Sequence, residues 1–285
     1  MNTAGARIAF QGELGAYSHQ ACLKAYPEME PLPCHTFEGA IAAVREGRAA
    51  LAMLPVENSS YGRVADIHSL LPGSGLYIIG EYFLRVHISL LGVPGAKLED
   101  ITEAVSHTVL LGQCRAFLER HGIARVAAAD TAGAAAEVAQ GRRTHRAALA
   151  SALAAELSGL EILAENIEDN PHNTTRFLIM SPRKIEAAPS EADVVTTFVF
   201  QVRNLPAALY KALGGFATNG VNMTKLESYM VDGRFTATQF LAEITGHPEH
   251  PAVARAFDEL RYFSTFVTIL GVFPAAEYRR QTDAL

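Results

Sequence analysis

Short apolar segments alternate with helical segments over the first two thirds of the chain, and no other feature constrains the fold more. RIAFQG (7–12) predicts a strand and residues 17–25 a helix, while ALAMLP (50–55) predicts a buried strand that ends at Pro55. From ARVAAAD to NTTRFLIM (124–180) strands and helices alternate again. This alternation is typical of α/β domains with mostly parallel sheets. The extended stretch 77–93 is long enough to cross between two lobes.

The sequence pattern changes after this α/β region. We predict a catalytic domain over 1–182, a linker rich in proline and charge over 183–193, a small domain over 194–275 and a tail over 276–285. The small domain has the order βαββαβ, which predicts a ferredoxin-like α+β fold. Its first helix is expected to carry Pro206 in its first turn. Asp232-Gly233 predicts a hairpin between its second and third strands.

Composition excludes several classes of protein. With 49% hydrophobic and 19% charged residues, the chain of 285 residues can bury a sizeable core. A net charge of −6 without a basic run argues against nucleic-acid binding, and the apolar runs are too short to span a membrane. The beginning of the chain has no signal-peptide pattern, and the three cysteines form no CxxC pair. We therefore expect a cytoplasmic protein with small-molecule partners.

The common catalytic signatures are absent from the sequence. No P-loop lysine, GxGxxG, GxSxG or HExxH pattern occurs, which excludes a standard kinase, dehydrogenase or serine hydrolase. The turn QGELGAYS (11–18) has glycines before a helix. Such a turn either lets an anion approach the helix amides or is an ordinary strand-to-helix turn, and both interpretations stay open.

Two polar segments are candidates for a ligand site. Glu57, Asn58 and Ser59 follow a strand, at the end of a parallel sheet where ligands bind, although Ser and Asn also cap helices. Ser106 and Gln113 are seven residues apart, so in one helix they would share a face. Their alternative interpretation is a helix cap and a surface glutamine.

A third polar segment combines a hydroxyl with a cation. Asn173, Thr174, Thr175 and Arg176 form a polar cluster before Phe177 and an apolar strand. A buried arginine needs an anionic partner, which is either a substrate carboxylate or a protein acid in an internal ion pair. In a desolvated cleft the neighbouring threonine hydroxyl could donate a proton.

These segments, taken in order, resemble the prephenate dehydratase family. The resemblance runs through IAFQGELGAYSHQA, PVENSSYG, SHTVLLGQC, DTAGAA, RAALAS and NPHNTTRF, and the small domain resembles the ACT regulatory domain. It implies a two-lobed catalytic domain like a periplasmic binding protein, which converts prephenate to phenylpyruvate with loss of water and carbon dioxide. It also implies that the enzyme needs no metal or organic cofactor and that L-phenylalanine inhibits it between paired ACT domains.

The resemblance assigns roles to particular residues. It implies catalytic roles for Thr175, Arg176, Asn58, Ser106 and Gln113, substrate binding by Glu57, Ser59, Thr174 and Phe177, and an effector site at Asn204, Ala207, Leu209, Glu227 and Ser228. Arg176 would hold the carboxylate that the product retains. The effector segments depart from the family, because Ala207 replaces the glycine of Gly-Ala-Leu and Tyr229-Met230 replaces the Arg-Pro of ESRP. We expect these changes to weaken or reshape the effector pocket.

Three alternative functions can be weighed against the same motifs. Arogenate dehydratase has the same chemistry on an amino-bearing substrate, and the motifs do not separate the two. A non-catalytic amino-acid sensor would not need the intact 175–177 motif, and an ACT-regulated enzyme of unrelated chemistry would have to match the first 180 residues by chance.

Two segments of the small domain, VVTTFVFQV (194–202) and TFVTILGVF (265–273), are apolar enough to need covering at sheet edges. We therefore expect a homodimer or homotetramer.

Overall fold

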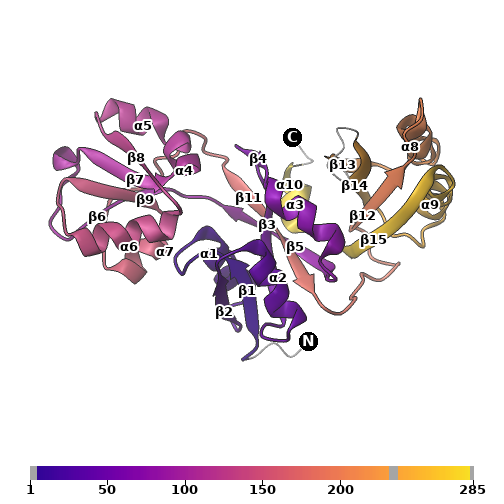
Figure 1. The fold of residues 1–285 in the computed structure, drawn as a ribbon, viewed down its shortest axis with the longest axis horizontal. Helices are drawn as coiled ribbons and strands as arrows, with labels where there is room; N and C mark the ends of the chain where they lie inside the picture. Colours follow the sequence, from indigo (N-terminus) through magenta and orange to yellow (C-terminus); the bar gives the residue numbers. More distant parts are fainter. Residues whose placement is uncertain (1–4, 231–236, 283–285) are drawn as a thin grey trace. The chain divides into compact units, whose positions relative to one another are not determined.

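The computed structural model describes residues 5–230 and 237–282 (Figure 1). The predicted turn at Asp232-Gly233 lies outside the described residues. The chain divides into two compact units, the first comprising Met1–Ile67 and Tyr82–Phe177 and the second His68–Glu81 and Leu178–Leu285. Strands β5 (Tyr77–Arg85) and β11 (Thr174–Ser181) therefore each contribute residues to both units.

The first sheet of unit 1 has the order β11-β3-β1-β2. Strand β1 pairs in parallel with both neighbours, and a short strand β4 pairs with the end of β3. The elements that build this part are β1 (Arg7–Gln11), α1 (Tyr17–Ala25), β2 (Glu30–Cys34), α2 (Phe37–Arg45), β3 (Leu51–Asn58) and β4 (Gly62–Arg63). Helix α1 has the predicted bounds.

Strand β3 is longer than the sequence predicted. It continues past Pro55 and ends at Asn58. Its pairing with β1 involves only Leu51, Ala52 and Met53, so the missing N–H of Pro55 leaves no gap in that ladder. The prediction that the strand ends at Pro55 is wrong, and the extension places Glu57 and Asn58 on a strand rather than in a loop.

The second sheet of unit 1 has the order β10-β6-β9-β7-β8. Its elements are β6 (Ser89–Gly92), β7 (Glu103–His107), α4 (Thr108–Gln113), α5 (Arg115–Arg120), β8 (Ala124–Ala128), α6 (Thr131–Gly141), β9 (Arg146–Ala150), α7 (Ala152–Ser158) and β10 (Glu161–Ala164). The chain enters this lobe between β5 and β6 and leaves it between β10 and β11 (Figure 1). The prediction that 77–93 crosses between two lobes is confirmed.

Two local predictions in this lobe have different outcomes. The sequence predicts Asp130 or Thr131 as the N-cap of α6, and Asp130 takes this position, because its carboxylate accepts the N–H of Gly133 at 2.6 Å. The segment 108–122 predicts one helix that ends at Gly122, but the structure divides it into α4 and α5, since Cys114 leaves the helical region with φ −116° and ψ 25°.

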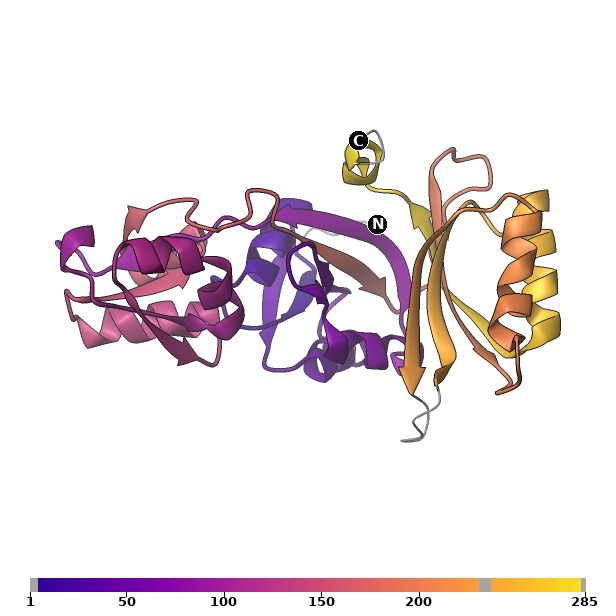
Figure 2. The same ribbon diagram turned by 90° about the horizontal axis from the view of Figure 1, so that it is seen from above.

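Unit 2 contains the predicted βαββαβ order. Its sheet has the antiparallel order β13-β14-β12-β15, and α8 and α9 lie side by side on one face (Figure 2). The elements are β12 (Val194–Val202), α8 (Ala208–Thr218), β13 (Met223–Met230), β14 (Ala237–Thr245), α9 (Pro251–Phe263) and β15 (Ser264–Pro274). Aromatic rings fill the space between sheet and helices, among them Phe198, Phe200, Phe216 and Phe257.

Helix α8 begins later than predicted. Its first residue is Ala208, so Pro206 precedes the helix instead of standing in its first turn. Ala207 is the N-cap and has a left-handed conformation with φ 61°. Such a conformation costs an alanine about 1–2 kcal/mol relative to glycine, which gives a physical reason for the glycine that the family resemblance places there.

The predicted exposed edges are also corrected. Strand β12, the segment 194–202, lies between β14 and β15 and is not an edge strand. Strand β15 has β5 on its other side, where Gly271 pairs with Ile78. The end of this sheet order is β13, whose side chains alternate between exposed and half-buried. Pairing of subunits through the βαββαβ sheet of unit 2 would therefore use β13.

The predicted tail is partly helical. Residues Glu277–Thr282 form helix α10. Its Arg279 reaches two buried carboxylates, donating to Glu81 at 2.7 and 2.8 Å and to Glu243 at 3.1 Å. Helix α10 is thereby tied to the sheet of unit 2. Within the described residues, no helix has the length and apolar character that crossing a membrane requires.

Candidate functional site

Three side-chain amides from separate segments of unit 1 form a closed ring. Asn58 Nδ2 donates to Asn173 Oδ1 at 2.8 Å, and Asn173 Nδ2 donates to Gln113 Oε1 at 3.0 Å. Gln113 Nε2 completes the ring with a longer bond of 3.5 Å to Asn58 Oδ1. The ring joins the end of β3, the end of α4 and the residue before β11.

The orientation of the Asn58 amide follows from its backbone partners. Asn58 Oδ1 accepts the N–H groups of Ser60 at 2.9 Å and Tyr61 at 3.0 Å, so this atom must be the oxygen. The Nδ2 group therefore points its second hydrogen at Thr175 Oγ1, at 3.0 Å. Because Thr175 accepts this bond through its oxygen, its own O–H is left to donate to another acceptor.

Burial makes this arrangement rigid. Asn173 is 1% exposed and Gln113 8% exposed, and each has a hydrogen-bond partner within the ring. Buried amides that lost these partners would carry a desolvation cost of about 1–3 kcal/mol each. Bonds in such a ring also polarise one another. The half-buried Thr175 hydroxyl is thus held by a preorganised polar scaffold.

Arg176 forms the internal ion pair that the sequence left as an alternative. Its Nη1 donates to Glu57 Oε2 at 2.9 Å, and its side chain is 6% exposed. Successive side chains of a strand point to opposite faces. Thr175 and Arg176 are adjacent on β11, as Asn58 and Glu57 are on β3, so the ion pair and the Asn58–Thr175 bond belong to opposite faces of the sheet. This geometry does not place the guanidinium beside the Thr175 hydroxyl.

The other predicted substrate-binding residues have structural contacts. Ser59 Oγ donates to the carbonyl of His172 at 3.0 Å and accepts the N–H of Thr174 at 2.9 Å. The N–H of Ser59 donates to the carbonyl of Thr174 at 2.9 Å. These bonds tie the loop after β3 to the start of β11. Phe177 is 1% exposed and lies in the core.

Ser106 is not brought into the amide ring. It lies on β7, because that strand extends through His107 and α4 begins only at Thr108. The prediction that Ser106 and Gln113 share one helix face is therefore wrong. The Ser106 side chain is fully buried, and its hydroxyl donates to the carbonyl of Leu149 on the neighbouring strand β9 at 2.7 Å.

The glycine turn before α1 packs closely against another helix. Gly15 has φ 96°, and a Cβ placed on it would lie 3.1 Å from Cα of Ala154 in α7. Its carbonyl accepts the Ser151 hydroxyl at 2.7 Å, and its N–H donates to His19 Nδ1 at 3.0 Å. These contacts explain the glycine by packing and leave its predicted role toward an anion as a hypothesis.

The environments of two cysteines argue against a thiolate nucleophile. Burial raises the pKa of the Cys22 thiol to about 12. Burial, together with the nearby charges of Asp169 and Glu168, raises the pKa of the Cys114 thiol still further. Both thiols are therefore protonated at neutral pH. Within the described residues, no group of three or more His, Cys, Asp or Glu side chains is placed to hold a metal ion.

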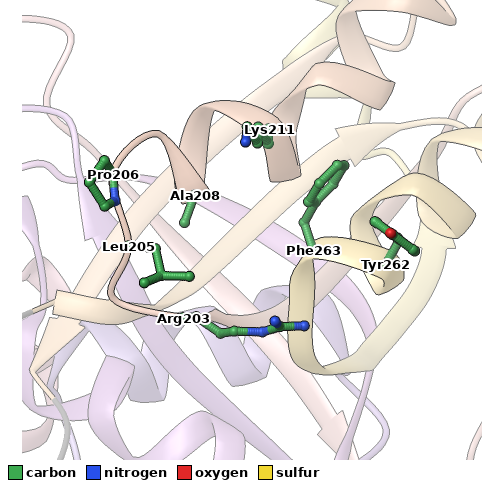
Figure 3. A pocket seen from close by; sticks show the side chains of 7 residues that line it. All are labelled: Arg203, Leu205, Pro206, Ala208, Lys211, Tyr262 and Phe263. Carbon is green, nitrogen blue, oxygen red and sulfur yellow. The ribbon is translucent and has the colours of Figure 1, made fainter.

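The predicted effector residues lie in two parts of unit 2. Asn204, Ala207 and Leu209 lie at the start of α8, whereas Glu227 and Ser228 lie on β13. A pocket of about 300 Å³ opens beside the first group (Figure 3), between the start of α8 and the end of α9. Sequence reasoning did not identify its lining, which combines two cations with apolar and aromatic side chains: Arg203, Leu205, Pro206, Ala208, Lys211, Tyr262 and Phe263.

Comparisons with known proteins cover nearly the whole chain. A family model described as prephenate dehydratase matches residues 8–185. A bifunctional N-acyl-homoserine lactone acylase/prephenate dehydratase of Komagataeibacter europaeus is 55% identical over 96% of this chain and 98% of its own. The chloroplastic arogenate dehydratase/prephenate dehydratase 1 of Arabidopsis thaliana is 39% identical over 94% of this chain and 72% of its own.

A solved structure of a relative resembles nearly the whole chain. It is a prephenate dehydratase from Arthrobacter aurescens in complex with L-Phe, with 28% identity, a TM-score of 0.85 and coverage of 98% of this chain and 97% of that chain. The similarity in sequence and the similarity in fold therefore agree.

Proposed function

The chain belongs to the prephenate dehydratase family and is a hydro-lyase, and on that premise we propose that it converts prephenate to phenylpyruvate in phenylalanine biosynthesis. In this reaction the ring hydroxyl leaves with a proton as water. The bond between the ring carbon and its carboxylate also breaks. The electron pair of that bond completes the aromatic ring as carbon dioxide departs. The enzyme must therefore supply a hydrogen-bond donor to the departing hydroxyl.

The observation that carries this proposal is the bond from Asn58 Nδ2 to Thr175 Oγ1, at 3.0 Å. A donor to Oγ1 stabilises negative charge on that oxygen, so the Thr175 O–H becomes a better donor to the leaving hydroxyl. In this account Thr175 touches the reacting atoms, while Asn58 and Gln113 orient it. Arg176 and Glu57 brace β3 against β11, and Ser106 supports the second sheet.

Purified protein tests the choice of substrate. We expect phenylpyruvate to appear from prephenate and be detected by its ultraviolet absorbance, with a higher kcat/KM than arogenate gives for phenylalanine. The relative from Arabidopsis thaliana carries both activities in its name, so both substrates are compared on one preparation. A higher kcat/KM for arogenate would assign the chain to the alternative substrate, and turnover of neither substrate would contradict the proposal.

We further propose that L-phenylalanine inhibits the enzyme through the C-terminal unit, which resembles an ACT domain, in a homodimer or homotetramer. Support comes from the βαββαβ order of unit 2 and from the L-Phe bound to the solved relative. Ala207 keeps the left-handed conformation of the position but adds a methyl group there. In the same assay we expect phenylalanine to lower the rate of phenylpyruvate formation.

Acylase activity is a second candidate, favoured by the 55% identity to a bifunctional relative. This activity would hydrolyse the amide bond of an N-acyl-homoserine lactone, so that one water molecule is consumed and homoserine lactone and a fatty acid are released. Because Cys22 and Cys114 are held protonated, we expect any such activity to persist when both are changed to Ala. Release of homoserine lactone by wild type and variant would support the candidate, whereas no release by the wild type would exclude it.

A further inference from the structure

An ion pair with a buried carboxylate lies where the chain crosses between the two sheets of unit 1. Arg85 ends β5, and Glu168 lies in the segment that returns from β10 to β11. Arg85 Nη2 donates to Glu168 Oε1 at 2.8 Å, and the side chain of Glu168 is 2% exposed. Glu168 Oε2 accepts the N–H of Ile88 at 2.9 Å. Both carboxylate oxygens are therefore engaged by the outgoing segment of the chain.

The other terminal nitrogen of the Arg85 guanidinium binds the backbone of Asn173, a member of the amide ring. Its Nη1 donates to the carbonyl of Asn173 at 2.7 Å and also contacts the carbonyl of Val86. The N–H of Val86 donates to the same Asn173 carbonyl at 2.8 Å. Two donors thus fix the main chain of the residue whose side chain closes the ring between Asn58 and Gln113.

The segment that begins at Glu168 holds a second member of the ring. The N–H of Asp169 donates to the carbonyl of Gln113 at 2.7 Å. The Asp169 carboxylate accepts the N–H of Ala116, at 3.1 Å, near the start of α5. The segment 168–173 therefore begins at Glu168, which is bound to Arg85, and ends at the ring member Asn173. Between them, Asp169 holds the backbone of Gln113.

We propose that Arg85 and Glu168 are positioning residues for the dehydratase reaction and act through Asn173 on the donor Thr175. The inference rests on the function proposed above. Neither residue touches Thr175. Their ion pair sets the position of the segment 168–173. A small displacement of that segment would move the Asn173 side-chain amide, which orients Asn58 toward Thr175.

Arg85→Lys tests this role, because lysine keeps the charge beside the buried Glu168 but loses the fork that bridges Glu168 and Asn173. We expect kcat for prephenate to fall about 10- to 100-fold with little change in KM, as for a donor displaced by a fraction of an ångström. Glu168→Gln should act in the same direction. The matched control is Arg115→Lys, which alters an exposed Arg–Glu pair in the same unit and should leave kcat unchanged. Melting temperatures establish that the variants are folded.

A double-mutant cycle with Asn173→Ala separates positioning from general support of the fold. If Arg85 acts through Asn173, Arg85→Lys will cost much less in the Asn173→Ala background than in the wild type. Full multiplication of the two effects, or a kcat for Arg85→Lys equal to that of Arg115→Lys, would overturn the positioning role. A wild-type enzyme that does not dehydrate prephenate would instead overturn the proposed function, so the two failures are distinguishable.

Discussion

Replacing Thr175 with valine is expected to lower kcat for prephenate by about 10²- to 10⁴-fold, the usual contribution of a positioned proton donor. Valine keeps the size and branching of threonine but has no hydroxyl to donate to the departing ring hydroxyl. It also leaves the second hydrogen of Asn58 Nδ2 without its acceptor. Steady-state rates of phenylpyruvate formation measure the effect, and KM should change little because the donor acts mainly in the transition state.

Thr175→Ser is the matched control for this prediction. Serine retains the hydroxyl and can still accept from Asn58, so most of the activity should return. If the valine variant kept a near-native kcat, Thr175 would have no part in the chemistry. If serine were as slow as valine, the methyl group and not the hydroxyl would be the essential feature.

Replacing Arg279 with methionine is expected to lower the free energy of unfolding by about 3–5 kcal/mol, the typical cost of removing one partner of a buried ion pair. The Glu81 side chain is fully buried and that of Glu243 is 2% exposed. Arg279 forms ion pairs with both carboxylates, and Thr197 adds a hydrogen bond to Glu243 at 3.1 Å. Methionine fills similar space but leaves both carboxylates without this cation.

Arg280→Met is the control, because the neighbouring residue makes an ion pair of similar length but different exposure. Arg280 lies 2.9 Å from Asp193, and the two side chains are 62% and 48% exposed. Such surface pairs contribute about 0–1 kcal/mol. Denaturant unfolding compares the two variants with the wild type. Equal losses would contradict the importance that burial gives to Arg279.

Much of the fold could be predicted from the sequence because local patterns determine its elements. Helix α1 and the βαββαβ order of the C-terminal unit follow from apolar spacing and turn residues. Strand β2 was missed because its segment, EPLPC, contains two prolines. Its place at the end of the sheet order explains why prolines are tolerated there.

The candidate site was predicted in part. Asn58, Gln113 and Thr175 were identified from motifs, and the structure brings them together. Asn173 was noticed as part of a polar cluster but not as a ring member, because the ring depends on contacts between distant segments. The side of the sheet to which Arg176 points could, by contrast, be predicted from the sequence. The alternation of side chains along 174–181 already indicated that Thr175 and Arg176 point to opposite faces.

The proposed dehydratase activity is tested most directly by the stoichiometry of prephenate consumption by the wild-type protein. Prephenate, phenylpyruvate and carbon dioxide are quantified together, beside a sample without enzyme that records spontaneous decay. We predict rapid turnover that forms phenylpyruvate and carbon dioxide in equal amounts as prephenate disappears, and Thr175→Val should lower this rate by about 10²- to 10⁴-fold. Prephenate loss at the spontaneous rate with the wild-type protein would show that the protein is not a prephenate dehydratase.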